Sequence, residues 1–420
     1  MISALTSRKI VWSTLVQYFG RLVTIGVGII TIKLVTNYLG ADEYGFYAKI
    51  SEFSLFFTTI ANLGIFGNVV RKMSESPTDG KLFTNALFLR LTTALAFFAV
   101  GLIYAFIFLP NTGFALGTLF FMGSLLFDHL TTVCTGMLQA SYMMGRSVFA
   151  NVCGRITILL TVFILIQLQT PAFAPLFFLA PLAGSVVNLT LSLAFVRAKI
   201  KFVWRLSRAL LRMLFLTALP FGIINIINSL YFRFLPSYFT ARVLSDAAYS
   251  SYNVSLHIAM TAAMLSTFLM FSTLPAFKQA LEGRHMQTAK SIYKVISKTL
   301  LVAAVLMVGV GSLLAPTAIR ILTNKTFIIP EFWFILPLLL TLGAVSFFYD
   351  LVLITVFAFE KEIWFLKREF LALALAASVF ALSLITKDPG PSTMLIILGA
   401  ILGELTMVLF GLRLIRKQLD

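Results

Sequence analysis

Long apolar stretches alternate with short polar connections along the whole sequence. This pattern predicts twelve membrane-spanning helices, because each stretch can cross roughly 30 Å of hydrocarbon at about 1.5 Å per residue. The expected spans are Ile10–Tyr38, Tyr44–Val70, Phe83–Leu109, Phe114–Met143, Ser147–Leu168, Phe173–Val196, Leu210–Tyr238, Ala247–Leu274, Ile292–Leu314, Phe332–Phe359, Trp364–Ile385 and Met394–Leu414. We therefore expect an all-α polytopic membrane protein.

The composition agrees with this class. Hydrophobic residues make up 59% of the 420 residues and charged residues only 12%, which is too apolar for a soluble domain. The first apolar stretch is too long and too interrupted by polar residues for a cleavable signal peptide. Both cysteines, Cys134 and Cys153, fall inside expected spans, so we expect neither a disulfide nor a metal site.

The positive charges indicate how the chain is oriented. The net charge is +17, and 22 basic residues fall in one set of alternating connections or in the ends of the spans beside them, against four in the other set. Positively charged connections stay in the cytoplasm, so both termini are expected there. This distribution favours a membrane topology signal over a nucleic-acid partner. The non-cytoplasmic connections are too short to hold a catalytic domain.

Two halves are expected. The most basic connection, 197–212, falls near the middle of the sequence and is expected to lie on the anionic inner leaflet between a lobe at 1–200 and a lobe at 201–420. Leu39–Tyr47 and Leu244–Tyr252 share a pattern of Leu, a small residue, three residues, Tyr, a small residue, any residue and Tyr, at a separation of 205 residues. We therefore expect two six-helix lobes related by pseudo-two-fold symmetry.

Four arginines inside the apolar stretches point to function. A charge near the membrane centre costs about 2.5 to 3.5 kcal/mol on insertion scales, so these arginines are expected to face a polar cavity between the lobes. A guanidinium binds phosphate through paired hydrogen bonds, which implies an anionic substrate. Amides at helical spacing near them extend the polar faces. The predicted substrate-binding residues are Arg21, Arg90, Arg155, Arg233, Gln17, Asn62, Asn151 and Asn225.

Acidic residues inside the spans have two interpretations. They can position the arginines or respond to a coupling ion, H⁺ or Na⁺, or they can form structural ion pairs and interhelical hydrogen bonds. The residues concerned are Glu52, Asp128, Asp350 and Glu404. A proton relay between Asp128 and His129 is disfavoured, because adjacent residues of a helix do not share a face. Pro220 and Gly222 predict a bend in the seventh span.

The sequence resembles a known family near its start. The runs Thr36–Gly45 and Ile60–Ile65, followed by Val70 and Arg71, resemble the opening of polysaccharide flippases (Wzx-like, O-antigen type) of the multidrug/oligosaccharidyl-lipid/polysaccharide exporter superfamily. Members commonly have a basic residue just before the Leu-Gly turn, where this sequence has Asn37. The motif covers about the first 70 residues, whereas length, span number and orientation agree over the whole chain.

The resemblance implies a transporter, not an enzyme, and no cofactor. It implies that undecaprenyl-diphosphate-linked oligosaccharide, of O-antigen or another surface polysaccharide such as lipopolysaccharide, passes from the cytoplasmic to the periplasmic leaflet of the bacterial inner membrane by alternating access. Membrane lipid, a coupling ion and a polysaccharide polymerase are the other expected partners.

Two alternatives stay open. A drug or cation antiporter of the same superfamily would share the fold, although the deep arginines repel cations. A membrane-embedded glycosyltransferase or glycan polymerase could use Asp42 and Glu43 as metal ligands, although such a pair at a helix start also stabilises the helix dipole.

Overall fold

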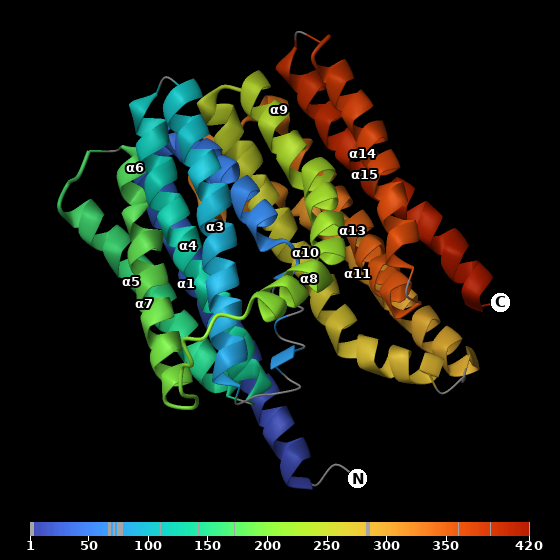
Figure 1. Ribbon diagram of the computed structural model, residues 1–420. Helices are drawn as coiled ribbons and strands as arrows, with labels where there is room; N and C mark the ends of the chain where they lie inside the picture. Colours follow the sequence, from blue (N-terminus) through green and yellow to red (C-terminus); the bar gives the residue numbers. More distant parts are fainter. Residues whose placement is uncertain are drawn as a thin grey trace. The chain divides into compact units, whose positions relative to one another are not determined.

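The protein forms two compact helical units, Met1–Asn225 and Ile226–Asp420. The computed structural model describes residues 4–65, 69, 72–73, 79–109, 111–141, 143–171, 173–282, 286–359, 361–386 and 388–419, and these contain helices but no strand. Figure 1 labels the helices in chain order. The first of these units ends inside α8, so the basic connection lies within it, and the division into lobes at 200/201 stays a prediction.

The first unit is built from helices that overlap the predicted spans, most of them long. They are α1 (Ala4–Asn62), α3 (Gly80–Phe108), α4 (Thr112–Ala140), α5 (Met144–Gln167), α6 (Ala174–Phe177), α7 (Leu179–Arg197) and most of α8 (Arg208–Ser229). Asp79 and Asn111 cap α3 and α4 with side-chain oxygens, which explains where these two helices begin.

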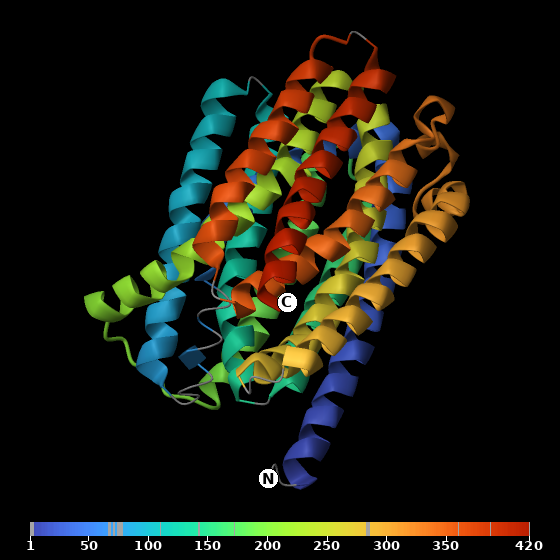
Figure 2. The same cartoon turned by 90° about the vertical axis from the view of Figure 1, so that its right-hand side faces the viewer.

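The second unit begins with a π-helical turn, η1 (Leu230–Phe234). Its other elements are α9 (Leu235–Val243), α10 (Asp246–Glu282), α11 (Met286–Leu313), α12 (Ala315–Leu322), the short 3₁₀ turns η2 (Lys325–Phe327) and η3 (Pro330–Phe332), α13 (Ile335–Ala358), α14 (Glu362–Ser383) and α15 (Pro389–Leu419). Figure 2 shows α14 and α15 running side by side, and they contact each other extensively.

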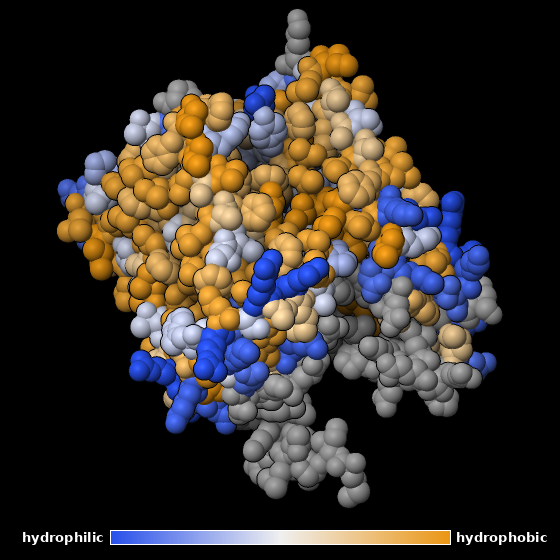
Figure 3. All heavy atoms as spheres, viewed as in Figure 1, coloured by the Kyte–Doolittle hydropathy of each residue, from blue (hydrophilic) through white to orange (hydrophobic). Residues whose placement is uncertain are grey.

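The helices agree with the prediction of a polytopic membrane protein. Among the described residues, eight helices are long and apolar enough to cross a membrane, or nine if the bent pair at α8 and α9 is one span. The element α1 consists of two helices that meet at a kink at Gly40, where φ is 75°, and they correspond to the first predicted span and to the second as far as Asn62. Hydrophobic residues cover most of the face shown in Figure 3, and hydrophilic residues gather at the lower left and at the right of that view.

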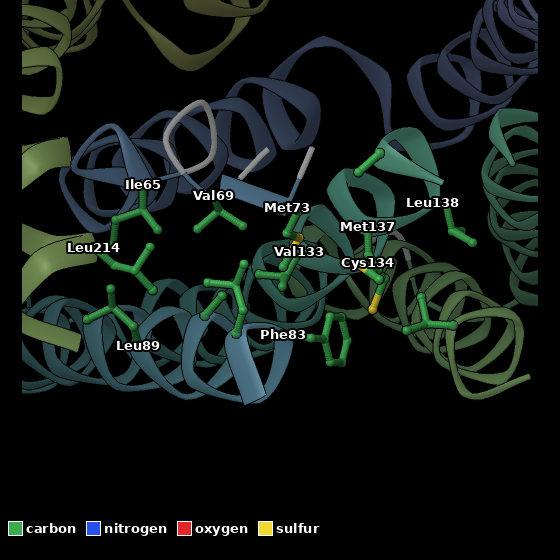
Figure 4. Close-up of a cluster of buried hydrophobic side chains, with 14 of the residues drawn as sticks. Ile65, Val69, Met73, Phe83, Leu89, Val133, Cys134, Met137, Leu138 and Leu214 are labelled. Atoms are coloured by element: carbon green, nitrogen blue, oxygen red, sulfur yellow. The ribbon is translucent and has the colours of Figure 1, made fainter. Parts of the chain in front are cut away.

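Each unit has its own apolar core. In the first unit, buried side chains from α3, α4, α7 and α8 meet around Phe83, Val133 and Leu214 (Figure 4). In the second unit, Ile296 and Leu300 of α11 pack with Phe347 of α13. Helices in lipid associate through such packing and through polar contacts, because lipid supplies no hydrophobic drive.

Two predicted features of the helix path have different outcomes. The bend around Pro220 is confirmed, since the segments Arg208–Pro220 and Gly222–Val243 meet at 43°. The second predicted span, Tyr44–Val70, is interrupted after Asn62, where α1 ends and Leu63 and Gly64 have φ values of 42° and 68°, while residues 66–68 and 70 lie outside the described residues. Positive φ angles cannot continue a right-handed helix.

The two copies of the Leu39–Tyr47 pattern have the same local geometry. Tyr44 and Tyr47 stack with ring centroids 5.8 Å apart, and Tyr249 and Tyr252 stack with centroids 5.7 Å apart. The first leucine of each copy is also buried. This likeness supports an internal repeat, while symmetry between whole lobes stays a prediction.

Candidate functional site

A polar face in the first unit begins where α1 packs closely against α5. A Cβ on Gly20 would lie 2.0 Å from Cγ1 of Val148, and one on Gly145 would lie 3.8 Å from Cγ1 of Val16. From the first contact to the second, the residue numbers decrease along both helices, so α1 and α5 run parallel here. This register brings Arg21 of α1 close to the level of Asn151 on α5.

Exposed polar side chains follow this register. Gln17 and Arg21 of α1 are exposed, as are Asn151 and Arg155 of α5. Asp128 of α4 is also exposed and interacts electrostatically with Arg155. We call these five residues the first-unit polar face. Charged groups at this depth in a span avoid lipid and face water or a polar ligand.

Arg90 does not belong to this face. Its side chain is buried, at 2% exposure, and its Nη1 donates a 3.0 Å hydrogen bond to the main-chain oxygen of Asn62, the last residue of α1. The final carbonyls of a helix have no partner within the helix, so Arg90 satisfies one of them. Within the described part of the chain, Arg90 Nε and Asn62 Oδ1 have no hydrogen-bond partner.

Adjacent residues of α4 point to different surroundings. His129 is buried beside Phe98, with ring centroids 5.6 Å apart, whereas Asp128 is exposed. This confirms that the two residues do not share a face. Among the arginines and acids predicted to act together, Arg155 and Asp128 interact electrostatically in this unit. The structure places Glu52 in the interior near Tyr44.

The second unit contains a buried acid cluster that the sequence analysis found only in part. Glu369 of α14 accepts hydrogen bonds from the hydroxyls of Tyr349 at 2.5 Å and Tyr231 at 3.0 Å. Asn228 donates to Tyr231 Oη and to Glu404 Oε1, both at 3.0 Å. We call Asn228, Tyr231, Tyr349, Glu369 and Glu404 the acid cluster.

The cluster is closed to solvent, and one acceptor in it is unused. Glu369 and Glu404 are both 0% exposed, and Glu404 Oε2 has no hydrogen-bond partner in the described part of the chain. Asp350 of α13 interacts electrostatically with Glu404 and accepts a 2.7 Å hydrogen bond from Ser266. Burying several carboxyl groups together is costly unless a proton or a cation reduces their charge.

The π-helical turn and a glycine make room for this cluster. Tyr231 lies in η1, where the extra residue per turn changes which side chains face inward. A Cβ on Gly403 of α15 would lie 2.6 Å from the Tyr231 ring, so only glycine lets the ring approach. Arg233 is half-buried in the same turn, and Asn225 is exposed at the end of the first unit.

Sequence reasoning missed Glu369, because Lys367 and Arg368 beside it indicate the polar end of a span. The spacing of Asn228 and Tyr231, three residues apart on one helix face, was the available signal for a polar contact there.

The two cysteines, Cys134 and Cys153, are free thiols.

Glu43, one of the two acids considered as metal ligands, has a structural role. Glu43 Oε2 accepts a 3.0 Å hydrogen bond from the main-chain nitrogen of Ala174, at the start of α6. Tyr38, nearby on α1, donates to the Thr170 carbonyl at 2.6 Å. Among the described residues, no group of three His, Cys, Asp or Glu side chains could hold a metal ion.

Comparison with solved structures shows the fold. An inward-facing multidrug resistance MATE family transporter of the MOP superfamily is 12% identical, with a TM-score of 0.72 over 94% of both chains. A MOP superfamily transporter from Pyrococcus furiosus is 14% identical, with a TM-score of 0.69 over 98% of this chain and 95% of that one. The lipid II flippase MurJ in an inward closed conformation is 13% identical, with a TM-score of 0.68 over 96% of this chain and 87% of that one.

Sequence comparison supplies the family. No curated protein matches the sequence significantly. The family described as polysaccharide biosynthesis protein matches residues 7–281, which is well over half of the chain. This protein, with the helical fold of MOP-superfamily transporters, therefore belongs to the polysaccharide biosynthesis protein family.

Proposed function

We propose that the protein is a flippase that moves an undecaprenyl-diphosphate-linked oligosaccharide from the cytoplasmic to the periplasmic leaflet of the bacterial inner membrane. The observation that carries this proposal is the first-unit polar face, where Arg21 and Arg155 are exposed within membrane spans. The family's description and the likeness to a lipid II flippase support a lipid-linked substrate of polysaccharide synthesis. An O-antigen repeat unit fits this description.

The chemistry of the polar face suits such a head group. Two guanidinium groups can each bind phosphate oxygens in pairs, and Asp128 balances part of their charge when the site is empty. The amides of Gln17 and Asn151 can exchange hydrogen bonds with sugar hydroxyls. The prenyl tail would stay in lipid, because the apolar surface of the spans offers it no better surroundings.

The acid cluster is the proposed coupling site. Glu369 uses both oxygens for hydrogen bonds from tyrosines, whereas one oxygen of Glu404 has no hydrogen-bond partner among the described residues, so Glu404 is the better candidate to take up a proton or Na⁺. Loss of that ion would leave adjacent buried carboxylates, which favours a rearrangement of the helices that hold them. This would link ion movement to the transport cycle.

The decisive experiment uses cells that lack the gene. They should accumulate lipid-linked oligosaccharide on the cytoplasmic side of the membrane, and the wild-type gene should restore export. Arg21→Gln and Arg155→Gln should fail to restore export at normal protein abundance, whereas Arg416→Gln, an exposed residue near the end of α15, should succeed. Full export by both polar-face variants, or accumulation of unlinked sugar precursors, would refute the proposal.

A drug or cation antiporter is the second candidate. The fold likeness to multidrug transporters favours it, and so does the acid cluster, which could hold a cation. Proteoliposomes that contain the purified protein should distinguish the two. Uptake of a cationic dye that depends on Glu404 and not on Arg155 would favour the antiporter.

A further inference from the structure

The connection between α7 and α8 is held rigidly against α3. Asn85 of α3 is fully buried, and its side-chain amide contacts the connection twice. Its Nδ2 donates to the Arg205 carbonyl at 2.9 Å, and its Oδ1 accepts from the Ser207 main-chain nitrogen at 2.8 Å. We call residues 197–208 the basic strap.

Two further contacts fix the strap on its inner side. Phe202 stacks on Phe83 of α3, with ring centroids 5.2 Å apart. A Cβ on Gly80 would lie 1.9 Å from the Lys201 carbonyl oxygen, so the strap touches the backbone at the start of α3. These contacts hold the backbone of the strap in one conformation, so its outward-facing side chains are already positioned for binding.

The outer side of the strap combines positive charge with exposed apolar groups. Six basic side chains on the strap and the first turn of α8 are exposed, and within the described part of the chain none of them has a hydrogen-bond or ion-pair partner: Arg197, Lys199, Lys201, Arg205, Arg208 and Arg212. No acidic residue lies between 197 and 212. Trp204 is 75% exposed and Leu206 is 53% exposed among them.

We propose that the basic strap is a binding surface for the anionic headgroups of membrane phospholipids. It joins two membrane spans, α7 and α8, on the predicted cytoplasmic side, so headgroups lie within reach. Tryptophan favours the interface between headgroups and hydrocarbon, and clustered Lys and Arg residues attract anionic lipid at about 1 kcal/mol each. The six cations are all exposed and are spread from the end of α7 to the start of α8, which suits several headgroups better than one diphosphate.

Asn85 is the positioning residue for this surface. Its amide satisfies one carbonyl and one N–H of the strap, so its substitution should let the strap move away from α3. Asn85→Leu removes both the donor to the Arg205 carbonyl and the acceptor for the Ser207 N–H without adding a charge. This change leaves all six basic residues and the net charge in place, and therefore separates the geometry of the strap from its charge.

The test measures which lipids contact Trp204. The purified full-length protein is reconstituted in phosphatidylcholine vesicles with a minority of phosphatidylglycerol, and either lipid is brominated to quench tryptophan fluorescence. The Trp204 signal is the difference between wild type and Trp204→Phe. We expect brominated phosphatidylglycerol to quench it more than an equal fraction of brominated phosphatidylcholine, with the preference falling about fivefold for each charge removed at low salt.

Matched variants make the result specific. The triple substitution Lys201→Gln, Arg205→Gln and Arg208→Gln should abolish the preference, whereas Arg413→Gln, Arg416→Gln and Lys417→Gln on α15 should leave it unchanged. Asn85→Leu should reduce it with the net charge unchanged. Equal quenching by both lipids, no quenching of Trp204, or a preference that survives the first triple substitution would overturn the proposal.

Discussion

At the scale of single residues, burial separates groups that look alike in sequence. Arg90 and Arg155 both interrupt apolar spans, yet Arg90 is enclosed at the end of α1 and Arg155 is exposed on α5. Glu369 and Glu404 are both buried, yet within the part of the chain that the structure describes Glu369 has partners for both oxygens and Glu404 for one. The partner of each buried group therefore decides whether it serves the fold, the substrate or the coupling ion.

The tyrosine hydroxyls of the acid cluster should stabilise the second unit. Tyr349→Phe removes the 2.5 Å hydrogen bond to Glu369 and leaves a buried carboxylate oxygen unsatisfied, which should cost about 1 to 3 kcal/mol in the free energy of unfolding. Tyr104→Phe removes a hydroxyl from a residue that is 45% exposed and should change stability little. Thermal unfolding in detergent compares them, and equal midpoints would contradict the role given to Tyr349.

Removing the charge of Arg90 should lower the stability of the protein, whereas removing the charge of Arg155 should stop export. Arg90→Gln leaves the Asn62 carbonyl without its donor, so we expect a loss of about 1 to 3 kcal/mol in stability and lower abundance in the membrane. Arg155→Gln should keep normal abundance and lose export. Immunoblotting with surface glycan measurement tests both. A stable Arg90→Gln protein that exports nothing would assign Arg90 to the substrate instead.

At the scale of elements, interruptions of helices mark the places where other helices approach closely. The end of α1 at Asn62 leaves Leu63 and Gly64 with positive φ, and Gly222 of α8 lies against the backbone of Leu63. The bend of 43° in the α8 and α9 pair occurs at the same glycine. Gly222, which together with Pro220 predicts the bend, thus also allows contact between α8 and the end of α1.

Substitution of Gly222 should disturb this contact. A Cβ there would lie 2.4 Å from the main-chain carbon of Leu63, and backbone cannot yield as a side chain can, so Gly222→Ala should destabilise the protein by about 1 to 3 kcal/mol. Gly309→Ala in α11 is the matched control, because a Cβ there meets nothing within 4 Å and alanine favours a helix. Thermal unfolding midpoints measure both, and the idea fails if Gly222→Ala unfolds no earlier than wild type.

At the scale of the whole molecule, the sequence predicted the helices better than their contacts. The length of the hydrophobic stretch alone predicts the start and the end of α5 to within a few residues of their positions in the structure, because lipid sets the length of every span. It could not place the end of α1 at Asn62, which depends on Arg90 and Gly222 from distant segments. It also missed Glu369, whose partners come from η1 and α13 and become neighbours only in the folded unit.

The polar face and the acid cluster lie in different units, so a coupled transporter must link them thermodynamically. If ion binding at Glu404 and substrate binding at Arg155 share one conformational equilibrium, each must change the affinity of the other by the same factor. For purified protein and polyprenyl-diphosphate-linked oligosaccharide, wild-type affinity should then depend on the proton or Na⁺ concentration.

Two substitutions should affect this dependence differently. Glu404→Gln should abolish the dependence of substrate affinity on the ion, because an amide cannot bind the proton and binds Na⁺ weakly. Arg155→Gln should weaken substrate binding by a similar factor at every ion concentration, since it leaves the acid cluster intact. Glu362→Gln, outside the cluster at the start of α14, should behave as wild type. If Glu404→Gln keeps the wild-type dependence on both ions, the coupling site lies elsewhere, while Arg155 continues to report on the substrate site alone.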